Sequence, residues 1–207
     1  MAACHLEFHV EEPSMEAFLR SWLPRILPEG CTFETYVYQG KPALLKRLEA
    51  RLNGYSSWLP DYYRIFVVVD RDGDDCTSLK SRLEECCKNA GLQSKRAANN
   101  PKWQLVTGIV IEELEAWYFG DWSAVETTYP GVSATVCKSK AYREPDAIKG
   151  GAWEAFERVL QRHGYFSQGL AKVQAATDIG KHMDASRNRS HSFAVFRDSV
   201  AESCEIG

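Results

Sequence analysis

The sequence predicts an α/β fold, with a parallel four-stranded sheet flanked by helices and followed by a C-terminal helical extension. Segments typical of strands and of helices alternate four times over the first 120 residues, which is the pattern of a doubly wound sheet. Residues 65–69, Ile-Phe-Val-Val-Val, form an unbroken run of β-branched and aromatic side chains. Such a run indicates a strand that is buried on both faces, as parallel strands under helices are.

The first strand and helix are separated by a proline. Residues 5–11 alternate between apolar and polar side chains, which predicts a strand. Pro13 cannot donate a hydrogen bond to a neighbouring strand, so the strand should end near Glu12 and a helix should begin there. Apolar residues then recur at helical spacing, and Pro24 should end or kink that helix.

The remaining elements of the sheet repeat this order. Residues 31–38 are expected to form the second strand, and leucines at helical spacing predict a helix over residues 41–52. A further helix follows the apolar strand and should stop at Gly91, because glycine commonly ends helices. Residues 104–111 complete the sheet as the fourth strand.

The pattern changes after Asp121. Residues 127–145 are rich in turn formers and predict a long loop. Three helices are expected after it, around residues 153–160, 170–183 and 193–200. We therefore predict an α/β domain over residues 1–125, with residues 126–207 forming a loop and helical extension that packs on it as part of one structural unit.

Composition and charge narrow the class of protein. With 207 residues, of which 44% are hydrophobic, the chain can bury one substantial core. A net charge of −3 gives no overall attraction to nucleic acid, so such binding would need a local basic patch. The seven cysteines lack the C-x-x-C spacing of metal sites and are expected to be reduced thiols. With no signal-like or membrane-length apolar segment, the sequence predicts a cytoplasmic protein that does not enter a membrane.

Four aspartates, Asp70, Asp72, Asp74 and Asp75, follow the apolar strand directly. Their charges repel one another, so this cluster destabilises the fold unless a cation neutralises it. Open α/β sheets bind their ligands at the carboxyl ends of the strands, which is where these residues lie. The stretch therefore predicts a site for a hard metal ion.

Acidic residues also follow two other predicted strands. Glu11 and Glu12 end the first strand, and Glu112, Glu113 and Glu115 come at and after the end of the fourth. Oxygen ligands of this kind suit Mg²⁺ or Mn²⁺, which bind through a few carboxylates, several waters and substrate phosphates. Because such an ion activates water and offsets charge on a phosphoryl oxygen, the pattern indicates a metal-dependent phosphoryl-transfer site.

Three other interpretations apply to the aspartate run. It could be a solvated acidic loop that binds nothing. A calcium-binding EF-hand loop is excluded, because Asp75 replaces the required glycine and Ser81 replaces the final glutamate. The run Asp70-Arg71-Asp72-Gly73 resembles the loop of haloacid-dehalogenase-type phosphatases, in which Asp70 would be the nucleophile. That enzyme class stays open as an alternative, although its usual threonine is Asp74 here.

Two segments of the chain resemble the Toprim domain of topoisomerases, primases and overcoming-lysogenization-defect-type nucleases. The matches are Val10-Glu11-Glu12-Pro13-Ser14 and Val69-Asp70-Arg71-Asp72. Glu12 stands where the family has a glycine. The resemblance implies a Toprim-like sheet in which Glu11, Asp70 and Asp72 are catalytic residues and ligands of Mg²⁺ or Mn²⁺, with Glu12 and Asp74 as further candidate ligands.

The whole chain is also similar to an uncharacterised prokaryotic family of Toprim-like proteins with a domain of unknown function. The similar segments are Glu112–Trp117 and Asn188–Phe193. This resemblance implies a nuclease effector of phage defence with an ATPase partner, and it makes Glu113 and Glu115 supplementary metal ligands.

A basic segment near the C-terminus suits contact with nucleic-acid phosphates. Arg187, Arg189, Ser190 and Ser192 combine cations and hydroxyl groups just before an expected helix. A helix cap with solvent-exposed arginines explains the same residues equally well. The leading hypothesis is thus a Mg²⁺-dependent nuclease for DNA or RNA. The alternatives are the phosphatase and a non-catalytic module that binds an ATPase.

Overall fold

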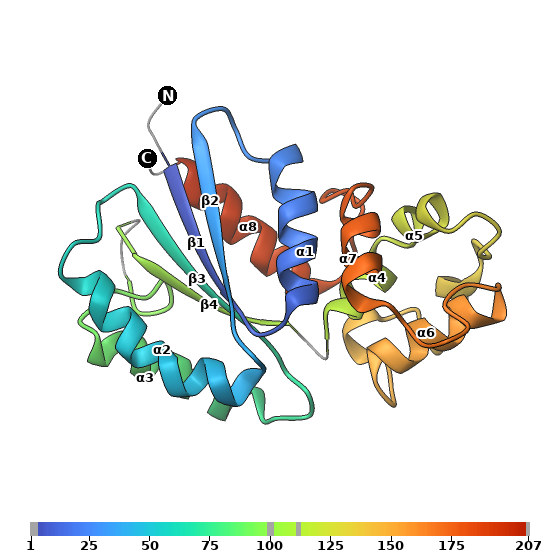
Figure 1. Ribbon diagram of the computed structural model, residues 1–207, viewed down its shortest axis with the longest axis horizontal. Helices are drawn as coiled ribbons and strands as arrows, with labels where there is room; N and C mark the ends of the chain where they lie inside the picture. Colours follow the sequence, from blue (N-terminus) through green and yellow to red (C-terminus); the bar gives the residue numbers. More distant parts are fainter. Residues whose placement is uncertain (1–3, 99–101, 111–112, 206–207) are drawn as a thin grey trace. The chain divides into compact units, whose positions relative to one another are not determined.

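The computed structural model describes residues 4–98, 102–110 and 113–205. It confirms the predicted class, because the chain forms an α/β structure with a four-stranded parallel sheet, flanking helices and a helix at the C-terminal end (Figure 1). The strands are β1 (Cys4–Val10), β2 (Cys31–Val37), β3 (Tyr63–Asp70) and β4 (Leu105–Val110), and their order in the sheet is β2-β1-β3-β4.

Eight α-helices and three 3-10 helices accompany the strands in the described ranges. The α-helices are α1 (Pro13–Trp22), α2 (Lys41–Ser56), α3 (Cys76–Asn89), α4 (Leu114–Gly120), α5 (Trp122–Thr128), α6 (Ala152–Arg162), α7 (Lys172–Gly180) and α8 (His191–Glu205). The 3-10 helices are η1 (Leu23–Arg25), η2 (Val136–Lys138) and η3 (Pro145–Ala147).

Proline and glycine act on the helices in different ways. Pro24 lies in the single 3-10 turn η1 that follows α1, as its position predicts. The helix α2 is longer than the sequence predicts, since it continues through Gly54 to Ser56. Tyr55 explains the extra turn, because its ring is 2% exposed in the core and its burial outweighs the low helix propensity of glycine.

The chain divides into two compact units, and neither is a continuous stretch of sequence. The sheet unit consists of Met1–Pro13, Leu27–Ile109 and Asp198–Gly207. The helical unit consists of Ser14–Ile26 and Val110–Arg197. Each unit has its own buried core.

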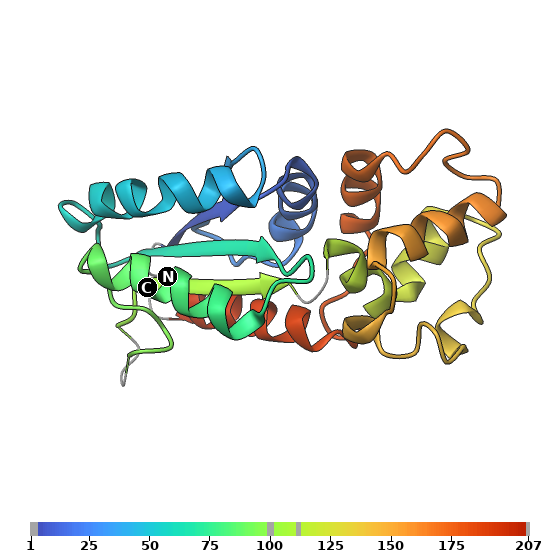
Figure 2. The same ribbon diagram turned by 90° about the horizontal axis from the view of Figure 1, so that it is seen from below.

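The core of the sheet unit lies between the sheet and two helices. Helices α2 and α3 cover the same face of the sheet (Figures 1 and 2), and their leucines pack against alternate residues of β3. This core includes Leu44, Leu48, Leu52, Ile65, Val67, Val69, Leu79 and Leu83. The last turns of α8 contact the other face, where the Trp103 indole N–H donates to Glu202 at 2.7 Å. Both faces of the central strands are therefore covered, as their apolar sequence predicts.

Aromatic rings form the core of the helical unit. They come from α1, α4, α5, α6 and the first turns of α8, and they are Phe18, Trp22, Trp117, Tyr118, Phe119, Trp122, Phe156, Phe193 and Phe196. The centroids of Trp117 and Phe193 are 5.1 Å apart, and those of Phe119 and Trp122 are 5.3 Å apart. Offset and edge contacts at these distances add to the stabilisation that burial provides.

Candidate functional site

A tight turn shapes the acidic run after β3. The N–H of Asp74 donates to the carbonyl of Arg71 at 2.9 Å, which closes a four-residue turn. The two central residues, Asp72 and Gly73, have φ angles of 49° and 79°. Asp-Gly is a favoured pair for turns with positive φ at both central positions. The same residues that make the segment acidic therefore also fold it back on itself.

Glu11 connects this turn to the loop after β2. Its side chain is buried, with one carboxylate oxygen accepting the N–H of Lys41 at 3.0 Å and the other accepting the N–H of Asp70 at 3.2 Å. Its backbone carbonyl also accepts the N–H of Gly40 at 3.2 Å. Because β1 lies between β2 and β3, a glutamate at its carboxyl end reaches both neighbours.

Lys41 binds the oxygen atoms of the turn. Its ammonium lies 2.7 Å from a carboxylate oxygen of Asp74 and 3.1 Å from one of Asp72, and it donates to the carbonyl of Arg71 at 3.1 Å. We call Glu11, Lys41, Asp70, Asp72 and Asp74 the strand-edge cluster. Lys41 was not among the residues expected at this site, although a lysine in the first turn of a helix opposes the helix dipole and so indicates an acidic partner.

The electrostatics of the strand-edge cluster favour a cation. Burial raises the pKa of Glu11, the charge of Asp72 raises it further, and Lys41 opposes both effects. Burial lowers the pKa of Lys41, but its hydrogen bonds to Asp74 and Asp72 outweigh burial, so the pKa of the ammonium is raised. The ammonium is therefore charged and offsets part of the negative charge around it.

Asp75 and Glu12, the remaining acids at the ends of β3 and β1, do not belong to the strand-edge cluster. Asp75 caps α3 by accepting the N–H of Ser78 at 2.7 Å, and this bond lowers its pKa. Glu12 is half-buried beside Glu11. The sequence alone does not decide between Glu11 and Glu12 as a ligand, and the carboxylate of Glu11 reaches the end of β3.

The carboxylates of the strand-edge cluster are not arranged as a compact three-acid metal site. Among the described residues, no three acids offer oxygen atoms that all lie within 4.8 Å of one another. Mg²⁺ does not need such a set, since it usually keeps several waters and binds one or two carboxylates directly. Glu11, Asp70 and Asp72 carry oxygen donors of the type that Mg²⁺ binds.

Glu113 and Glu115 belong to the helical unit. Glu113 precedes α4 and accepts the N–H of Trp153 at 2.9 Å, while Glu115 is buried within α4. Glu112 lies outside the described residues. The contacts of Glu113 place it at the start of α6, where an acid stabilises the helix dipole.

The carboxylate of Asp146 accepts hydrogen bonds from the hydroxyl groups of the basic segment near the C-terminus. Asp146 accepts the hydroxyls of Ser190 and Ser192 at 2.7 and 3.1 Å, and it also accepts the N–H groups of His191 and Ser192 at 2.6 and 3.2 Å. It caps α8 as a bound phosphate would. The guanidinium of Arg187 pairs with the buried Asp121 at 3.2 Å, and Arg189 is exposed.

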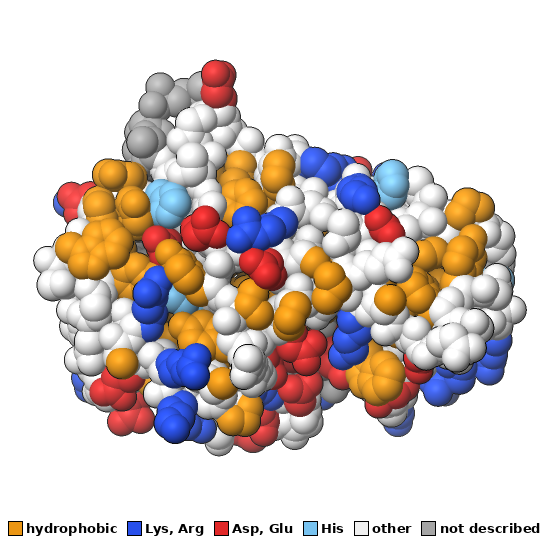
Figure 3. Space-filling view, viewed as in Figure 1, with side chains coloured by type: hydrophobic (Ala, Val, Ile, Leu, Met, Phe, Trp, Pro, Cys, Tyr) orange, Lys and Arg blue, Asp and Glu red, His pale blue; other side chains and the backbone are white. Residues whose placement is uncertain are grey.

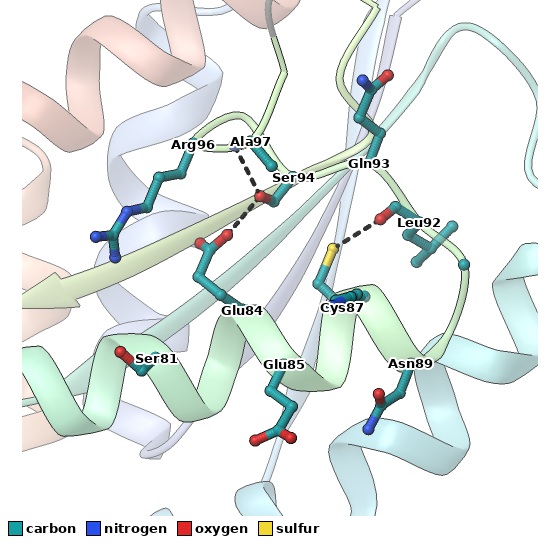
Figure 4. A pocket seen from close by; sticks show the side chains of 12 residues that line it. Ser81, Glu84, Glu85, Cys87, Asn89, Leu92, Gln93, Ser94, Arg96 and Ala97 are labelled. Atoms are coloured by element: carbon teal, nitrogen blue, oxygen red, sulfur yellow. Dashed lines mark hydrogen bonds between the residues drawn. The ribbon is translucent and has the colours of Figure 1, made fainter.

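A hollow of about 950 Å³ lies away from these residues, between α3 and residues 91–97 (Figure 4). Its polar groups bond to one another, since Ser94 donates to Glu84 and the thiol of Cys87 donates to the carbonyl of Leu92 at 3.3 Å.

On the face in Figure 3, Lys and Arg side chains are interspersed with Asp and Glu. That face offers no continuous basic surface.

Comparisons with known proteins give the family. In the part of the chain that the structure describes, no helix has both the length and the apolar character needed to cross a membrane. Comparison with curated proteins and with solved structures found no match. The family model described as a domain of unknown function (DUF4276) matches residues 10–201, from the end of β1 into α8. This match covers most of the chain, which therefore belongs to the DUF4276 family.

Proposed function

We propose that this protein is a Toprim-like, Mg²⁺-dependent nuclease that hydrolyses nucleic-acid phosphodiesters at the strand-edge cluster. The observation that carries the proposal is the position of Glu11. Its carboxylate accepts the N–H of Asp70 and lies close enough to Asp72 for that charge to raise its pKa. The two sequence motifs that resemble the Toprim domain thus meet at one edge of the sheet.

In this proposal Glu11, Asp70 and Asp72 would hold Mg²⁺ or Mn²⁺, with Glu12 and Asp74 as further candidate ligands. The ion, when bound, supplies an activated water and neutralises charge on the phosphoryl oxygen. Glu11 would bind the ion in its deprotonated form, and burial and the charge of Asp72, which raise its pKa, oppose that form when no ion is bound.

Lys41 has a distinct task in the proposal. Its ammonium bonds to Asp72 and Asp74, so it stabilises the turn when no metal is present. A cation at this position also attracts a phosphate to a site that is otherwise acidic. Lys41 therefore positions the substrate backbone rather than reacting with it.

The wider assignments follow the same proposal. The substrate is DNA or RNA, the location is cytoplasmic, and the biological role is phage defence together with an ATPase protein. The exposed guanidinium groups of Arg187 and Arg189 are the candidate contacts to the nucleic-acid backbone. The hydroxyls of Ser190 and Ser192 bond to Asp146, so they would contact a phosphate only if the phosphate replaced the carboxylate of Asp146.

A cleavage assay with matched variants tests the proposal. DNA and RNA substrates are incubated with Mg²⁺ or Mn²⁺ and with wild-type protein, Glu11→Gln, Asp70→Ala or Asp72→Asn. Asp75→Asn is the control, because Asp75 lies in the same loop but caps α3. We expect each cluster variant to lose at least about 100-fold in rate, since the metal supplies several kcal/mol to the transition state. The control should keep the wild-type rate.

The same assay separates the alternatives. Cleavage that is undiminished in Asp70→Ala would contradict the nuclease assignment. A phosphatase would instead hydrolyse small phosphomonoesters and form a covalent phosphoaspartate at Asp70, which mass spectrometry detects. A non-catalytic module would still bind an ATPase after all the cluster acids are replaced.

A further inference from the structure

Three cysteine thiols lie close together at the amino-terminal ends of β1 and β2. The strand-edge cluster lies at the carboxyl ends of the strands. Cys4 begins β1, Cys31 begins β2, and Cys204 lies in the last turn of α8. Their sulfur atoms all lie within 4.8 Å of one another. Among the described residues, this is the one group of three ligand atoms that is compact enough to hold a metal ion.

The backbone fixes the relative positions of the three thiols. Cys4 and Cys31 are direct partners in the parallel pairing of β1 with β2. The thiol of Cys4 donates to the carbonyl of Ser203 at 3.4 Å, which places the neighbouring Cys204 beside it. Glu202, which directly precedes Ser203, accepts the indole N–H of Trp103 at 2.7 Å and so anchors the end of α8. The cluster is thus held by a sheet register and by a packed helix.

The distances are close to those of a metal–thiolate site. Three sulfur atoms 4.8 Å apart would each lie about 2.8 Å from their common centre, and 4.8 Å is the upper limit here. Zn–S bonds are ~2.3 Å long, so a shift of about 0.5 Å for each sulfur would complete the geometry. Rotation about χ1 alone moves a cysteine sulfur by more than this amount.

Among the described residues, no fourth ligand atom belongs to this group. The imidazole of His5, the next residue to Cys4, bonds to the hydroxyl of Thr32 at 2.7 Å and lies 3.5 Å from Glu7. Its neighbours in the strand thus direct it away from the thiols. Cys4 is buried, whereas Cys31 and Cys204 are half-buried, so an ion can enter from their side.

We propose that Cys4, Cys31 and Cys204 form a binding site for a thiophilic metal ion, for which zinc is the expected occupant. Thiolate sulfurs select Zn²⁺ and Cu⁺ over the hard ions that suit carboxylates. The site is separate from the strand-edge cluster, because β1 has seven residues and the two sites lie at its opposite ends, about 20 Å apart. A bound ion would tie the first strand to the last helix.

Cd²⁺ is the probe for this site, because thiolate-to-cadmium charge transfer gives an ultraviolet absorption that carboxylates do not produce. Full-length protein is fully reduced, its free thiols are counted, and Cd²⁺ is titrated into wild type, Cys31→Ser and Cys204→Ser. Cys76→Ser is the matched control, since Cys76 is also half-buried but lies in α3. We expect saturation at one Cd²⁺ per chain in wild type and control, and affinity at least tenfold lower in the two cluster variants.

Thermal unfolding with Zn²⁺ gives a second readout that does not depend on activity. An ion at about 100 times its dissociation constant should raise the Tm of wild type and of Cys76→Ser by at least about 5 °C, because it binds the folded state alone. The shift should be absent in Cys31→Ser and Cys204→Ser. Equal cadmium binding by these variants and the control, or no saturable binding by reduced wild type, would overturn the proposal.

Discussion

The two units use their acidic residues in opposite ways. In the helical unit, Asp146 accepts four hydrogen bonds from the start of α8, and the buried Asp121 pairs with Arg187 and accepts the N–H of Asp184 at 2.7 Å. In the sheet unit, Asp72 and Asp74 share the single ammonium of Lys41.

This difference separates carboxylates that are surrounded by hydrogen-bond donors from carboxylates that share one cation. A carboxylate surrounded by donors lowers the energy of the native state, and its removal leaves those donors unsatisfied. Carboxylates that share one cation repel one another, and such strain is typical of functional sites. The acids around α8 therefore stabilise the fold, whereas in the strand-edge cluster repulsion between Glu11 and Asp72 offsets part of the stabilisation that Lys41 provides.

The largest expected effect is at Gly120, in the helical unit. An added Cβ would lie 2.0 Å from the amide oxygen of Asn188 and 3.1 Å from the N–H nitrogen of Ser190. We expect Gly120→Ala to reduce the free energy of unfolding by about 3 kcal/mol, because the cap of α8 must move. Gly54→Ala in α2 is the control, since nothing lies within 4 Å of its Cβ position. That variant should be as stable as wild type or slightly more so.

Denaturant unfolding of both variants measures these effects. A stability of Gly120→Ala equal to that of Gly54→Ala would show that the packing of α4 against residues 188–190 is loose. The contrast between the two units would then lose its structural basis.

The next effect compares one acid from each unit. Asp146→Ala removes the acceptor of two hydroxyls and two N–H groups, so we expect it to lower the free energy of unfolding by about 2 kcal/mol. Asp72→Asn relieves repulsion with Glu11 but also removes the ion pair with Lys41, so the two effects offset each other and we expect a change within about 0.5 kcal/mol. Urea unfolding monitored by circular dichroism gives both values. The comparison fails if Asp72→Asn proves the more destabilising of the two.

A smaller effect concerns pH and the buried histidine of the sheet unit. His9 is fully buried between the hydroxyls of Tyr38 and Tyr55, at 3.0 and 3.1 Å, and burial followed by the charge of Arg51 lowers its pKa to about 3. The unfolded chain binds a proton near pH 6.5 and the folded chain does not. The contribution of His9 to stability is therefore complete above pH 6.5 and is lost as the pH falls toward 3.

Unfolding measured between pH 7 and pH 4 tests this prediction. The free energy of unfolding of wild type should fall by up to roughly 1 kcal/mol per pH unit through His9, and His9→Gln should show a shallower dependence over the same range. Asp146→Ala, in the other unit, should keep the wild-type contribution of His9. A pH dependence that is unchanged in His9→Gln would assign the effect to other groups.

Local patterns predicted the strands and the meeting of Glu11 with Asp70. The apolar run of β3 and the alternation in β1 are properties of neighbouring residues, and parallel strands bring their carboxyl ends to one edge. The role of Lys41 could not be predicted in this way. It depends on β2 pairing with β1 and on the turn at Asp72 folding back, and both are tertiary features.

The thiol cluster and the cap of α8 show a second limit to what can be predicted from the sequence. Cys4, Cys31 and Cys204 follow no spacing rule, since their proximity comes from strand pairing and from the packing of α8. Metal motifs in sequence are recognisable only where ligands are neighbours along the chain. The serines before α8 were correctly placed at a helix start, but their sequence does not distinguish Asp146 from a phosphate as their anion.

The left-handed backbone at Asp72 has an evolutionary consequence. With a φ of 49°, this position accommodates Asp, Asn or Gly far more easily than alanine or a β-branched residue. Substitution of Asp72 during evolution should therefore favour Asn or Gly, and the loss of a single negative charge would leave the shape of the loop almost untouched. Relatives that keep this turn should accordingly carry one of these three residues at the position.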